Sequence, residues 1–276
     1  MSTTRIDTSA LFPERGTLIG MLHLGALPGT PFHHKSLDEI VQTAVHEARL
    51  LRDAGFECLM LENMGDRPYL AREVEPQVTS AMTRAALAVR AEVPELPLGL
   101  QILAGANHAA LAVAHSTGAA FIRAEGFAFA SVADEGLLES ADAGPLLRYR
   151  RSLGAEGVAV FADVQKKHSS HALTADLDLA ELTRGTLFCG ADGVVITGVT
   201  TAAPTALDDL RCAAAGAGPA PVLVGSGVTP EAAADLVPLA AGLIVGSYIK
   251  RRGAWDQPVD SERAAEICRA VRAARG

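Results

Sequence analysis

The chain has 276 residues, which suits one large barrel domain or two small domains. Hydrophobic residues make up 49% and aromatic residues only 4%, a composition that excludes a disordered or fibrous chain and disfavours a β-sandwich. The formal net charge of −8 argues against nucleic acid and anionic lipid as partners, because an acidic surface repels both.

The cysteines and the apolar runs indicate the compartment. Residues 1–14 are polar and contain no apolar signal core. The longest uncharged run, 236–249, is shorter than the roughly 20 residues that a membrane-spanning helix needs, so we expect no membrane span. The four cysteines are scattered through apolar stretches, which favours reduced thiols in a cytoplasmic protein: Cys58, Cys189, Cys212 and Cys268.

Strand and helix patterns alternate along the whole chain. Short, β-branched, apolar segments typical of strands buried on both faces occur at 18–22, 58–61, 98–103, 121–124, 158–164, 193–197, 222–224 and 243–245. Helical patterns follow each of them, beginning at Leu37 behind a capping box at 36–39, at Pro76, Asn107, Pro145, Asp176, Pro204, Thr229 and Ser261.

This alternation predicts an α/β fold, a single-domain (β/α)₈ TIM barrel over residues 1–276 with a polar N-terminal extension at 1–15. No linker or low-complexity segment divides the chain. The alternative is an open doubly wound sheet, which would need a G-x-G-x-x-G motif after the first strand. Residues 23–29 do not match that motif, so the barrel is favoured.

The last two predicted strands each run directly into small residues. Gly225, Ser226 and Gly227 follow the seventh strand, and Gly246 and Ser247 follow the eighth. In a barrel, the backbone N–H groups of these two loops commonly converge on a phosphate. Glycine also serves tight turns that bind nothing, but two such turns with serine donors favour a phosphorylated ligand.

Polar residues just past the other strands are the remaining candidates, because barrel active sites lie at the C-terminal ends of the strands. Glu62 and Asp163 end the second and fifth strands and could divide acid and base roles between them. Alternatively, one of the two pairs with a cation and only positions it. The predicted substrate-binding residues at these ends are His23, Asn63, Arg123 and Thr197.

Lys167 and His168 follow the fifth strand and are predicted to be catalytic. The lysine could stabilise developing negative charge, and the histidine could act as a general base near neutral pH. A Schiff-base lysine would require a desolvated site. The neighbouring Lys166 favours the alternative of a solvated loop face, with His168 as a loop hydrogen-bonding residue.

The histidines do not form a recognisable metal motif. His33 and His34 are adjacent, and His168 and His171 are three apart in a predicted loop, with no H-E-x-x-H or cysteine-rich set nearby. We therefore predict no protein-held metal site. Mg²⁺ bridging a carboxylate and a substrate phosphate remains a candidate cofactor, because such a site needs only one or two carboxylates.

Several motifs resemble those of the BtpA/SgcQ family. They are the segments 19–24 (IGMLHL) and 27–31 (LPGTP), Glu62-Asn63, Ala162-Asp163-Val164, Lys167-His168, 224–229 (VGSGVT) and 244–250 (IVGSYIK). The resemblance spans nearly the whole chain and implies a barrel enzyme. It also implies a phosphoribosyltransferase-like label for some members and a link of cyanobacterial members to photosystem I biogenesis.

Together these observations predict a cytoplasmic barrel enzyme that acts on a small phosphorylated metabolite, such as a sugar phosphate or phosphoribosyl compound. Isomerisation, carbon–carbon cleavage and glycosyl transfer all fit the predicted residues. The alternatives are a non-catalytic assembly factor and a sensor of phosphorylated ligands. Alanine-rich outer helices also suggest association into a homo-oligomer.

Overall fold

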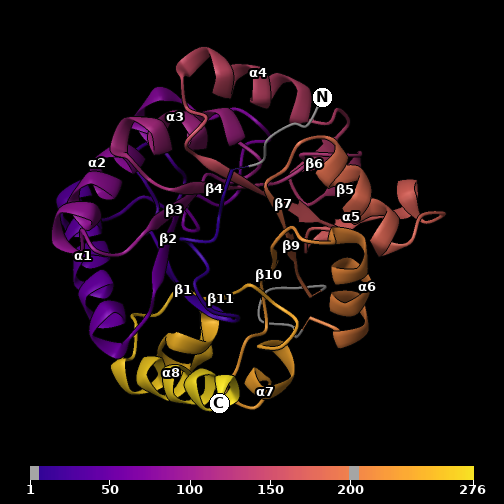
Figure 1. Ribbon diagram of the computed structural model, residues 1–276. Coiled ribbons are helices and arrows are strands. Elements are labelled where there is room, and N and C mark those ends of the chain that lie inside the picture. The colour runs from indigo at the N-terminus through magenta and orange to yellow at the C-terminus, as the bar shows by residue number, and fades with distance from the viewer. Residues whose placement is uncertain (1–5, 199–204) are drawn as a thin grey trace.

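The computed structural model describes residues 6–198 and 205–276. Its centre is a closed barrel of parallel strands in the order β1-β11-β10-β9-β7-β4-β3-β2, which confirms the predicted fold (Figure 1). The barrel strands are β1 (Thr17–His23), β2 (Cys58–Glu62), β3 (Leu98–Gln101), β4 (Phe121–Ala124), β7 (Ala159–Val164), β9 (Gly193–Ile196), β10 (Val222–Val224) and β11 (Gly242–Val245).

A ring of helices surrounds the barrel (Figure 1). The capping box at the start of the first helix forms as predicted, since Ser36 and Glu39 exchange side-chain and backbone hydrogen bonds. Gly55 ends that helix in the left-handed conformation. The helices are α1 (Leu37–Ala54), α2 (Pro76–Glu92), α3 (Asn107–Thr117), α4 (Ala143–Leu153), α5 (Leu179–Phe188), α6 (Leu207–Ala217), α7 (Ala233–Leu236) and α8 (Ser261–Arg275).

Two helices begin later than the sequence predicts. The segment from Thr229 forms a turn in which the N–H of Ala232 bonds the carbonyl of Thr229 at 3.2 Å, so α7 starts only at Ala233. Helix α5 starts behind Asp178, whose side chain accepts the N–H of Glu181 at 2.7 Å. Pro204, the predicted start of the sixth helix, lies outside the described residues.

A small antiparallel sheet was not predicted. Its strands β5 (Ser131–Ala133), β6 (Gly136–Leu138) and β8 (Ser169–Ser170) lie beside α5 and join the loop after β4 to the loop after β7 (Figure 1). Strands of two or three residues are too short to show a repeat in the sequence. Two 3₁₀ turns, η2 (Ser247–Ile249) and η3 (Arg251–Gly253), follow β11.

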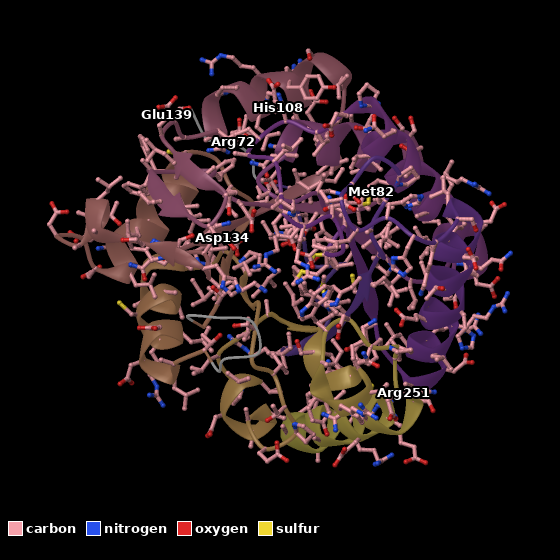
Figure 2. All side chains as sticks on the ribbon, turned by 180° about the vertical axis from the view of Figure 1, so that it is seen from behind. Arg72, Met82, His108, Asp134, Glu139 and Arg251 are labelled. Atoms are coloured by element: carbon pink, nitrogen blue, oxygen red, sulfur yellow. The ribbon has the colours of Figure 1, made fainter. Side chains whose placement is uncertain are left out.

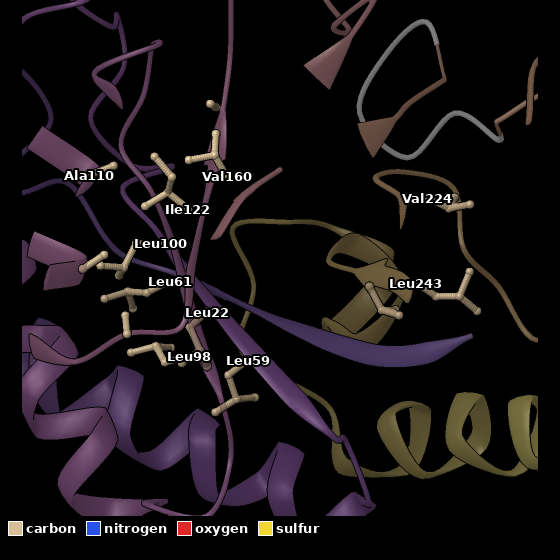
Figure 3. Close-up of a cluster of buried hydrophobic side chains, with 14 of the residues drawn as sticks. Leu22, Leu59, Leu61, Leu98, Leu100, Ala110, Ile122, Val160, Val224 and Leu243 are labelled. Atoms are coloured by element: carbon tan, nitrogen blue, oxygen red, sulfur yellow. The ribbon is translucent and has the colours of Figure 1, made fainter. Parts of the chain in front are cut away.

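Apolar side chains form two separate cores, one on each face of the barrel wall. The outer core lies between strands and helices and includes Leu22, Leu61, Ile122 and Val160 of the strands and Ala110 of α3 (Figure 3). The inner core fills the barrel axis and includes Met21, Met60, Phe161 and Leu223. Because successive residues of a strand point to opposite faces, every barrel strand except β3 contributes to both cores; the inward positions of β3 are Gly99 and Gln101.

The N-terminal segment closes the end of the barrel where the strands begin. Phe12 packs edge-on against Phe161 with ring centroids 5.4 Å apart. The backbone N–H of Ile6 donates to Asp192, just before β9, at 3.2 Å. Loops meet at the opposite end, where Arg72 lies near His108 (Figure 2) and donates to the backbone carbonyl of Gly126 at 3.0 Å.

Candidate active site

The two-residue repeat of the strands determines which side chains reach the barrel mouth. Met21 of β1 lies in the inner core, so the next inward position is His23, and the same step leads from Met60 to Glu62 in β2. The register pairs His23 with Glu62 directly. The corresponding positions at the ends of the eight strands, or one residue beyond them, are His23, Glu62, Gln101, Arg123, Asp163, Thr197, Gly225 and Gly246.

Above this layer lies a cavity of about 180 Å³. It is smaller than the roughly 300–1,000 Å³ of pockets for drug-sized ligands, so it suits a small molecule. The structure brings nine of the predicted site residues together in its lining: His23, Glu62, Arg123, Lys167, Gly225, Ser226, Gly227, Gly246 and Ser247.

The two glycine turns lie side by side on this lining. At Gly225 a Cβ atom would meet Cγ1 of Val195 at 2.7 Å, so only glycine allows this close approach. Gly227 adopts a left-handed φ of 68°. Within residues 6–198 and 205–276, the backbone N–H groups of Gly227 and Ser247 donate to no protein acceptor. Both turns therefore offer donors to a ligand.

Arg263 of α8 also lines the cavity, although it is not among the site residues predicted from the sequence. Its Nε donates to the backbone carbonyl of Tyr248, and its guanidinium stacks 4.3 Å from the centre of the Tyr248 ring. The hydroxyl of Tyr248 in turn donates to Glu266 at 2.6 Å. The one available signal was the position of Arg263 in the first turn of the helix after the eighth strand.

Glu62 and His23 form a pair at the mouth. Nε2 of His23 lies 3.4 Å from the Glu62 carboxylate, and Nδ1 of His23 lies 3.2 Å from the backbone carbonyl of Trp255. Burial alone would raise the pKa of Glu62, but the hydrogen bond and charge of His23, with Lys167 and Arg123, lower it. Glu62 is therefore a carboxylate at neutral pH, able to accept a proton.

Arg123 and Asp163 form a second, fully buried pair. Nε and Nη2 of Arg123 donate to the Asp163 carboxylate at 2.9 to 3.2 Å. Burial opposes the charge of Arg123, but Asp163 raises its pKa, so the guanidinium stays charged. Asp163 is absent from the cavity lining among the described residues. This geometry matches the alternative in which one carboxylate only positions a cation.

Lys167 is partly buried and reaches the cavity from the loop after β7. In the described part of the chain, no carboxylate oxygen lies within 4.0 Å of its ammonium nitrogen. Burial lowers the pKa of Lys167, and the charge of Arg123 lowers it further against the opposing pull of Glu62.

Besides Asp163, three predicted site residues lie outside the cavity lining. Asn63 follows the inward-facing Glu62 and is fully buried, where its amide accepts the N–H of Leu103 at 2.7 Å and donates to Asp66 at 2.8 Å. The buried Thr197 hydroxyl has no hydrogen-bond partner among the described residues. His168 is exposed, with a left-handed φ of 58°.

Next to the cavity, Lys166 joins two carboxylates. Its ammonium lies 2.5 Å from Glu135, at the turn between β5 and β6, and 3.6 Å from Glu125. Burial alone would lower the pKa of Lys166, but these carboxylates raise it. Burial also raises the pKa of Glu125. The cluster fastens the small sheet to the barrel.

The lining suits an anion better than Mg²⁺. Glu62 is the only carboxylate lining the cavity among the described residues, and His23, Lys167 and Arg123 surround it. In those same residues, no group of three or more histidine, cysteine or acidic side chains could hold a metal ion without a substrate. A Mg²⁺ ion that bridges a substrate phosphate needs one or two carboxylates, and in this lining it would compete with three cationic side chains for Glu62. Mg²⁺ as a cofactor therefore stays a prediction.

Solved structures with the same fold include two enzymes. Thiamine phosphate pyrophosphorylase from Pyrococcus furiosus matches with a TM-score of 0.58 at 14% identity, covering 96% of this chain and 100% of that one. Phosphoribosyl anthranilate isomerase from Thermus thermophilus matches with a TM-score of 0.55 at 12% identity, covering 94% and 99%. At these identities the likeness concerns the barrel fold.

The described helices include none that is long and apolar enough to cross a membrane.

Two relatives align over most of the chain. An uncharacterized mitochondrial protein of Caenorhabditis elegans is 39% identical over 270 residues, covering 96% of each chain. The photosystem I biogenesis protein BtpA of Synechocystis is 34% identical over 269 residues, covering 96% of this chain and 91% of that protein. Residues 14–273 match the family model as well, and the chain belongs to the BtpA family.

Proposed function

We propose that the chain is an enzyme that binds a small phosphorylated metabolite at the mouth of its barrel. The observation that carries the proposal is the convergence of two glycine turns on one cavity, with unbonded N–H groups at Gly227 and Ser247. Arg263 adds a cation on the same side. Backbone donors and a guanidinium are the groups that commonly bind phosphate.

The same cavity also supplies groups for chemistry. Glu62 is a buried carboxylate that can move a proton or stabilise a cationic centre. Lys167 and Arg123 can stabilise developing negative charge. Isomerisation, carbon–carbon cleavage and glycosyl transfer all use such a set. A cytoplasmic location, homo-oligomerisation and a lack of nucleic-acid partners stay predictions.

A thermal-shift comparison of wild type and Gly227→Asp tests the phosphate site. A ligand at a hundredfold excess over its Kd stabilises the folded protein by about 2.7 kcal/mol. That gain corresponds to a rise of roughly 5–11 °C in Tm. Inorganic phosphate and a panel of sugar phosphates should produce this shift in wild type and none in Gly227→Asp, because the new carboxylate would repel the phosphate.

Two control variants separate charge from strain. Gly227→Asn imposes the same left-handed conformation without the charge and should keep part of the shift. Gly157→Asp adds the same charge at an exposed position near the opposite end of the barrel, where a Cβ atom meets nothing within 4 Å. Equal ligand-induced shifts in wild type and Gly227→Asp would refute the phosphate site.

A non-catalytic biogenesis factor is the second candidate function, and the name of the Synechocystis relative favours it. The substitution Glu62→Gln distinguishes the two, since it removes the only carboxylate among the described lining residues and preserves the shape of the side chain. An enzyme should lose its biological activity in a complementation assay, whereas a scaffold should keep it.

A further inference from the structure

The sequence contains only four lysines, and the structure gives each a distinct environment. Lys35 is exposed on the surface before α1. Lys166 is held by Glu125 and Glu135. The ammonium of Lys250 is buried 2.7 Å from a carboxylate on α1. Lys167 alone combines access to the cavity with the lack of an ion-pair partner among the described residues.

A buried ammonium is costly unless a counter-charge pairs with it. Lys167 instead shares the cavity with the charged guanidinium of Arg123. The carboxylate of Asp163 already accepts hydrogen bonds from Arg123 through both of its oxygens, so it does not serve as a partner for Lys167. A second cation beside a partly buried lysine favours its neutral amine, which is a nucleophile. The lowered pKa of Lys167 agrees with this geometry.

We propose that Lys167 is the nucleophile of the site and forms an imine with the carbonyl carbon of a phosphorylated aldehyde or ketone. The inference rests on the proposed function, because the glycine turns would hold the phosphate while the carbonyl group reaches Lys167. Both groups line the same cavity, together with Glu62 as the proton carrier. This narrows the substrate class to small phosphorylated carbonyl compounds.

The Lys167 ammonium first loses one proton to solvent, in the direction that its lowered pKa favours, and the freed amine attacks the carbonyl carbon. The nitrogen–carbon bond forms as the carbon–oxygen π bond breaks, and the oxygen takes one proton from solvent. In this adduct, Glu62 carries a second proton from nitrogen to oxygen. The oxygen then leaves as water, and the iminium nitrogen keeps the third proton and the positive charge.

Reductive trapping tests the inference on the wild-type protein. The protein is incubated with dihydroxyacetone phosphate, glyceraldehyde 3-phosphate and phosphorylated ketoses and aldoses of four to six carbons. Sodium borohydride then reduces any iminium to a stable secondary amine, and peptide mass spectrometry locates it. We expect the label at Lys167, and none at Lys166, whose ammonium is paired with Glu125 and Glu135.

Lys35 serves as the internal control for non-specific reaction, because it is exposed. Labelling of Lys167 should reach its plateau at a lower pH than labelling of Lys35, since burial and Arg123 lower the pKa of Lys167. Lys167→Arg should lose the principal label, whereas Lys35→Arg should keep it.

The outcomes separate this inference from the phosphate proposal. Labelling of Lys167 that inorganic phosphate suppresses supports both. Equal labelling by dihydroxyacetone and its phosphate supports the imine and overturns the phosphate handle. A phosphate-induced thermal shift without label at Lys167 from any member of the panel, or with equal label at Lys35, overturns the imine alone.

Discussion

The buried pair of Lys250 and Glu47 offers a sharp test of how the glycine turn after β11 is held. Nζ of Lys250 lies 2.7 Å from one oxygen of Glu47, and the other oxygen accepts the N–H of Val259 at 2.9 Å. Lys250 is 1% exposed and Glu47 is 4% exposed. The pair thus ties the chain on either side of η3 to α1, directly after the turn that contains Ser247.

Lys250→Met removes the ammonium and leaves the Glu47 carboxylate buried without its counter-charge. Breaking a buried pair in this way costs about 3–5 kcal/mol. We expect the low end of that range, because Glu47 keeps its hydrogen bond from Val259. With about 2–4 °C for each kcal/mol, a loss of about 3 kcal/mol should lower Tm by roughly 6–12 °C. Differential scanning calorimetry measures Tm, and urea unfolding measures the free energy of unfolding.

The double variant Lys250→Met/Glu47→Gln isolates the charge. Glutamine can still accept the Val259 N–H but carries no charge, so most of the lost stability should return. Arg211→Met serves as the matched control, because Arg211 pairs with Asp208 at the same kind of distance, 2.9 Å, on the surface. It should change stability by less than about 1 kcal/mol. A double variant as unstable as Lys250→Met would refute the reasoning.

Two further predictions concern residues around the cavity. Asn63→Ala leaves the buried N–H of Leu103 without its acceptor, which should cost roughly 1–3 kcal/mol in urea unfolding; an unchanged midpoint would contradict the supporting role of Asn63. Burial raises the pKa of Glu125 in the folded state, so the stability that its proton contributes is present at low pH and is lost as the pH rises through the folded pKa. The Glu125→Gln variant cannot ionise at this position, so its stability relative to wild type should improve between pH 5 and pH 8. A decline over that interval would show that the folded protein favours the charged form of Glu125.

The site residues divide into those that a strand repeat can locate and those that it cannot. The inward-facing positions of Glu62 and Gly225 can be predicted from the sequence, because every second residue of a strand faces inward and barrel sites lie at the strand ends. The same repeat, carried one step further, places Asn63 on the opposite face. Asp163 also ends a strand, but its pairing with Arg123 depends on the register of β4 and β7.

The alternation of strand and helix patterns determined the barrel, because the periods of two and 3.6 are local properties of the backbone that each segment carries in its own residues. The sequence likewise predicted that the two glycine turns lie together, and the phosphate that they would bind stays a proposal. Only the closed tertiary structure decided that Arg263 of α8 joins them, that a small sheet fastens Lys166, and that Lys167 stands without a carboxylate partner among the described residues. These contacts depend on distances between segments that are far apart in the chain. Burial and ion pairing arise only when those segments meet, and they determine whether a side chain is charged.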